Sequence, residues 1–258
     1  MNCIEYERYT ENLKNNLLNC IGVIGLVAVG SMSRQNYRPD KWSDHDFFVI
    51  VRTGHQQEFR NDLSWLPNFD SILLSFQETE HGLKVLYNSG HLIEFAVFDS
   101  KELYFSKTNC YQILIDRENI EDHLRKIRQT TAEESNLNCS NEVLIGQFIV
   151  NLLVGLGRYK RGEKVSAHEF VKISALKKLL ILLEKHLVNE NNNLLDNIDP
   201  LRRFEFVYSD LGKEMESILL KPIPEAAGAL LNVLRRELSG QLSLEYKKAI
   251  EIIISKYL

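Results

Sequence analysis

The first half of the chain mixes helical and extended hydrophobic patterns. Residues 4–20 place apolar side chains at three- and four-residue spacing, which predicts a helix. Short apolar runs bounded by turn-forming residues predict strands over 23–29, 46–51, 71–76, 83–87 and 92–98. A second helix is predicted over 56–66, ended by Pro67. The Asn88-Ser89-Gly90 run predicts a hairpin between the last two strands.

The second half carries a helical pattern to its end. The polar stretch 130–142 marks the change and is interpreted as a linker or the start of a helix. Helices are predicted over 142–160, 167–188, 200–221, 224–238 and 244–257. The expected fold class is therefore α+β, with an N-terminal mixed-sheet domain over 1–132 followed by a C-terminal helical bundle over 133–258.

Composition narrows the class of protein. The chain has 258 residues, 26% of them charged, and a net charge of −4, which does not suggest a nucleic-acid partner. The longest apolar tract, 143–156, is interrupted by Gln147 and Asn151, so we expect a core helix and no membrane span. The cysteines show no Cys-x-x-Cys spacing and the N-terminus is polar. The cytoplasm is the expected compartment.

The candidate functional residues lie in one stretch between two apolar runs. Gly30-Ser31 follows the first run, and Asp44-His45-Asp46 leads into the second. Residues i and i+2 of a strand project from one face about 7 Å apart, so the two aspartates would point together and His45 away. Hard oxygen ligands of this kind select Mg²⁺ or Mn²⁺. A Gly-Ser turn offers backbone N–H groups and a hydroxyl to phosphate oxygens, so the combination indicates nucleotide chemistry.

These residues resemble the signature of the nucleotidyltransferase superfamily, which has the polymerase-β-like fold. The closest resemblance is to the antibiotic-modifying branch, the aminoglycoside and lincosamide nucleotidyltransferases. Two segments carry it, Gly30-Ser31-Met32-Ser33-Arg34-Gln35 and Ser43-Asp44-His45-Asp46. The motifs cover about the first hundred residues of the chain, and the helical second half resembles these enzymes only in its architecture.

The resemblance implies roles for particular residues. Gly30 and Ser31 would hold the nucleotide phosphates, with Arg34 adding positive charge. Asp44 and Asp46 would bind two Mg²⁺ ions, and Glu94 would be the third acidic ligand on a later strand. A basic residue late in the first helix of the second domain, Arg158 or Lys160, would also contact phosphate. The site residues are therefore Asp44, Asp46 and Glu94 for catalysis and metal, and Gly30, Ser31, Arg34 and Arg158 for the nucleotide.

One departure from the pattern concerns the general base. The kanamycin-type enzymes carry a glutamate in that helix, but no acidic residue lies between Glu142 and Glu163 here. Glu94 would then serve as the base as well, and Glu142 is the alternative. A buried Glu94, flanked by Ile93 and Phe95, would need a partner, which a metal would supply.

The implied function is metal-dependent transfer of AMP from ATP to a hydroxyl of a small molecule, an aminoglycoside or a lincosamide. The partners are then a nucleoside triphosphate and this acceptor. Three alternatives stay open: a protein-modifying or toxin–antitoxin nucleotidyltransferase, a non-catalytic relative that binds nucleotide, and an RNA-tailing enzyme, which the acidic balance disfavours. The acceptor, the nucleotide preference and pairing as a homodimer are not decided by the sequence.

Overall fold

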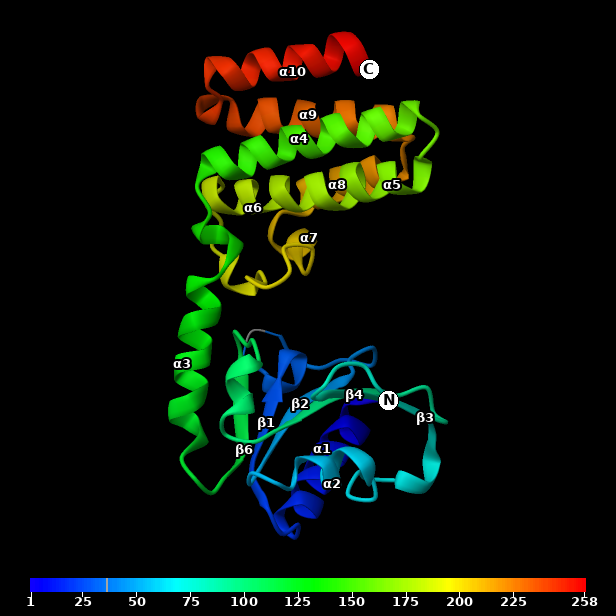
Figure 1. Ribbon diagram of the computed structural model, residues 1–258, viewed down its shortest axis with the longest axis vertical. Coiled ribbons are helices and arrows are strands. Elements are labelled where there is room, and N and C mark those ends of the chain that lie inside the picture. The colour runs from blue at the N-terminus through cyan, green and yellow to red at the C-terminus, as the bar shows by residue number, and fades with distance from the viewer. Residues whose placement is uncertain (36) are drawn as a thin grey trace. The chain divides into compact units, whose positions relative to one another are not determined.

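The computed structural model describes residues 1–35 and 37–258. The chain divides into two compact units, Met1–Glu133 and Glu134–Leu258 (Figure 1). Each unit has its own hydrophobic core. The first combines helices with a mixed sheet and the second is helical, which confirms the α+β class expected from the sequence. That the second unit binds an acceptor stays a prediction.

A six-stranded sheet in the order β3-β4-β5-β2-β1-β6 forms the centre of the first unit. Strands β2 and β5 run parallel, and the other neighbouring strands are antiparallel. The strands are β1 (Val23–Val29), β2 (His45–Val51), β3 (Ile72–Gln77), β4 (Gly82–Tyr87), β5 (Leu92–Phe98) and β6 (Tyr111–Asp116). The helices of this unit are α1 (Cys3–Leu18), α2 (Gln56–Asn61) and α3 (Ile120–Glu133).

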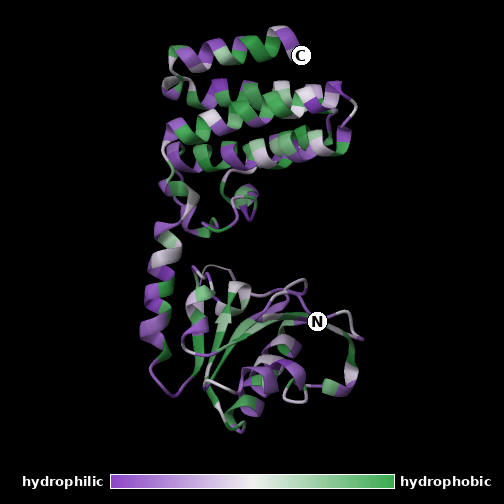
Figure 2. Ribbon diagram, viewed as in Figure 1, coloured by the Kyte–Doolittle hydropathy of each residue, from purple (hydrophilic) through white to green (hydrophobic). Residues whose placement is uncertain are grey.

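Helices cover both faces of this sheet because each face carries an apolar set of side chains. On one face, α1 and α2 pack through residues such as Leu13 and Phe59 against alternate positions of β2 and β5. On the other face, α3 packs through Ile120 and Leu124. Helix α3 is otherwise mainly polar, as Figure 2 shows.

The predicted strands and the hairpin between β4 and β5 are confirmed, but two elements were not predicted. Strand β6 lies at the sheet edge beside β1. Helix α3 includes residues 130–133, so the first part of the predicted linker is the end of a helix. Helix α2 also ends at Asn61, before the expected stop at Pro67.

The helices of the second unit surround one apolar core (Figure 2). They are α4 (Asn141–Lys160), α5 (Lys164–His168), α6 (Leu176–His186), α7 (Phe204–Val207), α8 (Ser209–Leu220), α9 (Ile223–Leu238) and α10 (Leu244–Tyr257). The segment Glu169–Ala175 between α5 and α6 is a π-helix, so the predicted helix over 167–188 is interrupted. The predicted helix over 200–221 is likewise two helices, α7 and α8.

Helix α4 is long and apolar enough to cross a membrane by length and composition alone. Its buried side chains, among them Leu144, Phe148 and Leu152, lie in the core of the second unit. The Ser140 hydroxyl caps its first turn by accepting a hydrogen bond from the Val143 amide. These are the features of a core helix, as the interrupted apolar tract predicts.

Candidate active site

The Gly-Ser turn and Asp46 meet at close range. Gly30 begins a short 3₁₀ turn after β1 with φ +56°, a left-handed conformation that favours glycine. A Cβ atom on Gly30 would lie 2.8 Å from Asp46 Oδ2. Glycine is required here for two reasons, the backbone angle and the space that the carboxylate occupies. The sequence signature therefore corresponds to an actual approach of these residues.

The register of the two parallel strands brings a second carboxylate to the same face. Asp46 on β2 pairs with Glu94 on β5. Paired residues of neighbouring strands project from the same side of a sheet, so Glu94 faces the same side as Asp46. Asp44 lies two residues before Asp46, and its carbonyl accepts a hydrogen bond from the Tyr6 hydroxyl at 2.8 Å.

Glu94 already has a cationic partner. Lys84 Nζ, on the neighbouring strand β4, lies 3.1 Å from Glu94 Oε1 and 3.1 Å from Glu78 Oε1. These hydrogen bonds, that to Glu94 first, raise the pKa of Lys84. The expectation that Glu94 is buried is therefore wrong, because its side chain is partly exposed, and Lys84 supplies a partner. Its role as a metal ligand stays a prediction.

The Ser31 hydroxyl is buried beside these carboxylates. Ser31 is 7% exposed, and its Oγ forms no hydrogen bond of normal geometry with the described residues. The Tyr6 hydroxyl lies close enough for Ser31 to lower its pKa, but burial is the larger effect and raises the pKa of Tyr6 far above its ordinary value, with Asp46 and Asp44 adding to the rise. A buried hydroxyl without a partner is costly, so this atom is suited to a ligand oxygen.

The two arginines assigned to phosphate have partners of their own. Arg34 ends the Gly-Ser turn with φ +58° and forms an ion pair with Glu7 of α1. Arg158 belongs to α4 in the second unit, where it pairs with Glu163 and lies over the Phe170 ring. Their phosphate contacts stay predictions.

His45 lies between the two aspartates in sequence and is fully buried on the α1 side of β2. Its ring stacks on Tyr6 with centroids 3.7 Å apart, and its Nδ1 lies 2.7 Å from His91 Nε2. Burial, with His91 adding, lowers the pKa of His45 to about 3, so the ring is neutral at ordinary pH. The strand pattern places His45 away from the aspartates, as the structure has it, but gives no sign of a contact with His91. The contact between them joins residues 46 positions apart, which no local pattern reveals.

The carboxylates fit a metal ion only if phosphate oxygens supply further ligands. Among the described residues, no three His, Cys, Asp or Glu side chains lie together as a metal site would require. Mg²⁺ is commonly held by one or two carboxylates together with substrate phosphates. Asp44 and Asp46, beside the unpartnered Ser31 hydroxyl, fit that kind of site. Glu94 would have to exchange Lys84 for the metal.

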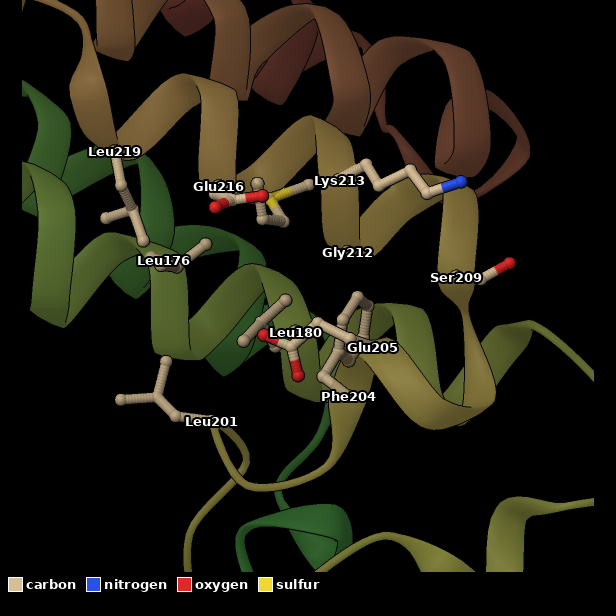
Figure 3. Close-up of a pocket in the computed structure, with 11 residues that line it drawn as sticks. Leu176, Leu180, Leu201, Phe204, Glu205, Ser209, Gly212, Lys213, Glu216 and Leu219 are labelled. Atoms are coloured by element: carbon tan, nitrogen blue, oxygen red, sulfur yellow. The ribbon is translucent and has the colours of Figure 1, made fainter.

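A separate pocket lies within the second unit, between α6, α7 and α8 (Figure 3). Its volume is about 460 Å³, and its apolar wall includes Leu176, Leu180 and Phe204. Glu205, Lys213 and Glu216 also line it (Figure 3). Lys213 forms an ion pair with Asp210, and neither glutamate carboxylate forms an ion pair within the described residues. The pocket combines an apolar surface with two carboxylates and one ammonium group.

A comparison with known protein families finds a match over part of the chain. Residues 21–138 match the family described as streptomycin adenylyltransferase. This stretch includes β1, the Gly-Ser turn, both aspartates and Glu94. This stretch is therefore similar to nucleotidyltransferases, and among them to the adenylyltransferases that modify antibiotics, as its motifs predict.

Similar solved structures include an aminoglycoside 6-adenyltransferase from Bacillus subtilis, with 10% identity, coverage of 95% of this chain and 90% of that one, and a TM-score of 0.32. A nucleotidyltransferase-like protein from Exiguobacterium sibiricum has 14% identity, coverage of 97% and 80%, and a TM-score of 0.35. The E. coli MS115-1 CdnC:HORMA-deltaN complex has 13% identity, coverage of 94% of each chain, and a TM-score of 0.30. TM-scores of this size do not establish a shared fold. A comparison with curated proteins finds no significant match.

Proposed function

We propose that this protein transfers AMP from Mg²⁺-bound ATP to a hydroxyl group of a small cationic acceptor, an aminoglycoside or a lincosamide. The observation that carries the proposal is the meeting of Gly30, Ser31 and Asp46, with Glu94 across the strand pair. An unpartnered buried hydroxyl beside carboxylates supports a ligand that brings both phosphate oxygens and a cation.

Asp44 and Asp46 would hold the metal, and Glu94 would join them at a second ion. A divalent ion bound there would neutralise the triphosphate and stabilise charge on the attacking and leaving oxygens. Ser31 donates a hydrogen bond to a phosphate oxygen. Arg34, released from Glu7, offsets negative charge on the leaving pyrophosphate.

Transfer itself is an in-line displacement. The acceptor oxygen forms a bond to the α-phosphorus while the bond to the bridging oxygen breaks, and pyrophosphate leaves. The proton of the acceptor hydroxyl passes to a carboxylate oxygen of Glu94, which stands on the same sheet face as Asp46. Glu142, the alternative base, lies in the first turn of α4 in the second unit.

The pocket of the second unit supports a cationic acceptor. Glu205 and Glu216 would attract amino groups, and the leucine and phenylalanine side chains would cover an apolar ring face. The net charge of −4 favours the same class of acceptor. We expect the Glu205→Gln, Glu216→Gln double variant to raise KM for the acceptor with little change in the affinity for ATP.

The test is pyrophosphate release from ATP with Mg²⁺ and a panel of aminoglycosides and lincosamides. The proposal expects release only with a suitable acceptor, together with label from α-labelled ATP on that acceptor. Label on a polypeptide would instead support the protein-modifying alternative. ATP binding without turnover on any acceptor would support a non-catalytic relative. Chain extension of RNA would overturn the small-molecule assignment.

A further inference from the structure

A buried polar network lies on the sheet face opposite the candidate site. His45 at the start of β2 contacts His91, which directly precedes β5, with a distance of 2.7 Å between Nδ1 and Nε2. His45 Nε2 also lies 3.0 Å from the Thr10 hydroxyl of α1. The Tyr6 ring stacks on His45, and its hydroxyl reaches the Asp44 carbonyl. The network therefore contacts Asp44 itself and the residue that follows it.

Burying such a polar network in a hydrophobic core costs free energy. His45 is completely buried and His91 is 7% exposed, in a region where tyrosine and other apolar side chains surround them. Buried imidazoles lose their hydration and must find partners, whereas apolar residues would fill the same space without that cost. Apolar packing alone fixes position less strictly than a hydrogen bond between two defined ring nitrogens.

The place of the network suggests what this hydrogen bond fixes. His45 is the residue before Asp46, and His91 is three residues before Glu94. In the ladder, His45 pairs with Ile93 and Asp46 pairs with Glu94. The hydrogen bond between the two imidazoles thus links the two strands at the end where Asp46 and Glu94 lie.

We propose that His45 and His91 are a positioning pair that holds the starts of β2 and β5 at the spacing required for metal and nucleotide binding. The pair contacts neither ligand and acts through Asp44, Asp46 and Glu94. This inference rests on the proposed function, because it concerns the same carboxylates.

The test compares variants by their affinity for a non-hydrolysable ATP analogue, measured by calorimetry with Mn²⁺ and again with EDTA. His91→Leu removes the hydrogen bond at similar volume, and His91→Gln keeps a polar atom near Nε2. Tyr87→Phe is the matched control, because it removes buried hydroxyl contacts with Tyr9 and the Pro67 carbonyl in the same core. Melting temperatures are recorded for all proteins.

We expect His91→Leu to weaken Mn²⁺-dependent binding by about tenfold or more, as loss of supporting residues around metal ligands commonly does. His91→Gln should keep most of the Mn²⁺-dependent affinity that His91→Leu loses. Tyr87→Phe should lower the melting temperature and leave the Mn²⁺-dependent affinity unchanged. If His91→Leu does not fold, His91→Met, which also removes the hydrogen bond to His45, provides the same comparison.

Two results would overturn the pair's role. One is wild-type Mn²⁺-dependent affinity in a folded His91→Leu or His91→Met variant. The other is an equal loss of Mn²⁺-dependent affinity in Tyr87→Phe, which would show that the loss follows from lower stability of the core in general. A wild-type protein that gains no affinity from Mn²⁺ would contradict the proposed function itself, and the positioning role with it.

Discussion

At the scale of single residues, the candidate site depends on a glycine and a carboxylate that share one space. Gly30 combines a left-handed backbone angle with the approach of Asp46 Oδ2. Ser31, the next residue, is buried and keeps its hydroxyl without a partner among the described residues. In the proposed function, Gly30 would make room for Asp46 as a metal ligand, and Ser31 would present a hydrogen-bond donor to phosphate.

Gly30→Ala should therefore disable transfer more than it destabilises the fold. The left-handed angle costs an alanine about 1–2 kcal/mol. The added Cβ would also displace the Asp46 carboxylate, so we expect at least about a tenfold loss in kcat/KM. Gly54→Ala is the control, because Gly54 has φ +97° but no described atom within 4 Å of its Cβ position. Equal loss of activity in both variants would count against the proximity argument.

A carboxyl group in the second unit gives a prediction about pH. Burial, with Asp196 adding, raises the pKa of Glu184 from 4.5 to about 6. Between these values the folded protein binds more protons than the unfolded chain, so this group's contribution to stability is lost as pH rises through the window. Glu184→Gln should thus stabilise at pH 7 by about 1 kcal/mol, a value discounted for the partial exposure of the side chain.

Urea unfolding at pH 7 and pH 4 measures this effect. The advantage of Glu184→Gln should disappear at pH 4, where the wild-type carboxyl is protonated in both states. Glu190→Gln, at an exposed position six residues later and beyond the end of α6, should change stability little at either pH. An advantage that is the same at both pH values would contradict the electrostatic explanation.

At the scale of elements, close packing around α4 shapes the second unit. Gly155 faces the π-helical segment, and a Cβ there would lie 2.6 Å from Val171 Cγ2 and 3.1 Å from Phe170 Cβ. A small residue is what lets the two helices approach. Gly146 lies on the same helix with no described atom within 4 Å of its Cβ position.

These two glycines predict opposite effects of one substitution. Gly155→Ala should destabilise by about 1–3 kcal/mol, because the added methyl group overpacks the contact. Gly146→Ala should stabilise by about 0.5–1 kcal/mol, since alanine loses less conformational entropy in a helix. Urea midpoints of the two variants test this, and stabilisation by Gly155→Ala would show that the helices do not need the close approach.

Local patterns predicted the elements whose own residues define them. β1, β2 and β5 are apolar runs bounded by turns, so their existence followed from sequence. β6 was missed because a short edge strand with Gln112 and Asp116 lacks a clear apolar alternation. α3 was missed because charged residues dominate it outside a few buried positions.

The site was predictable to the extent that its residues are close in sequence. Gly30, Ser31, Asp44 and Asp46 form a recognisable motif, and Glu94 was placed by resemblance. The Lys84 partner of Glu94 and the contact between His45 and His91 depend on strand register. Register is set by the folded sheet and cannot be read from one stretch of sequence.

At the scale of the whole molecule, two units with separate cores carry different parts of the proposed function. The motif residues for metal and triphosphate are in the first unit, except Arg158. The acidic pocket is in the second. Nucleotide binding should therefore change amide hydrogen exchange differently in the two units.

Amide hydrogen exchange measured with and without an ATP analogue and Mg²⁺ tests this difference. We expect slower exchange in peptides covering 23–51 and 92–98, because ligand binding stabilises the strands that hold the site. A peptide covering 157–163 should also slow if Arg158 contacts the triphosphate. Binding by calorimetry with unchanged exchange over 23–51 would place the nucleotide elsewhere.

The central claim is that Asp46 holds a metal ion for nucleotidyl transfer, and the most direct test is acceptor-dependent pyrophosphate release by Asp46→Asn. The substitution keeps the shape of the side chain and removes its charge. We predict a loss of at least about a hundredfold in kcat/KM, equivalent to about 2.7 kcal/mol, with an unchanged melting temperature and full activity in Asp70→Asn, an exposed control. Wild-type transfer by a folded Asp46→Asn variant would contradict the account.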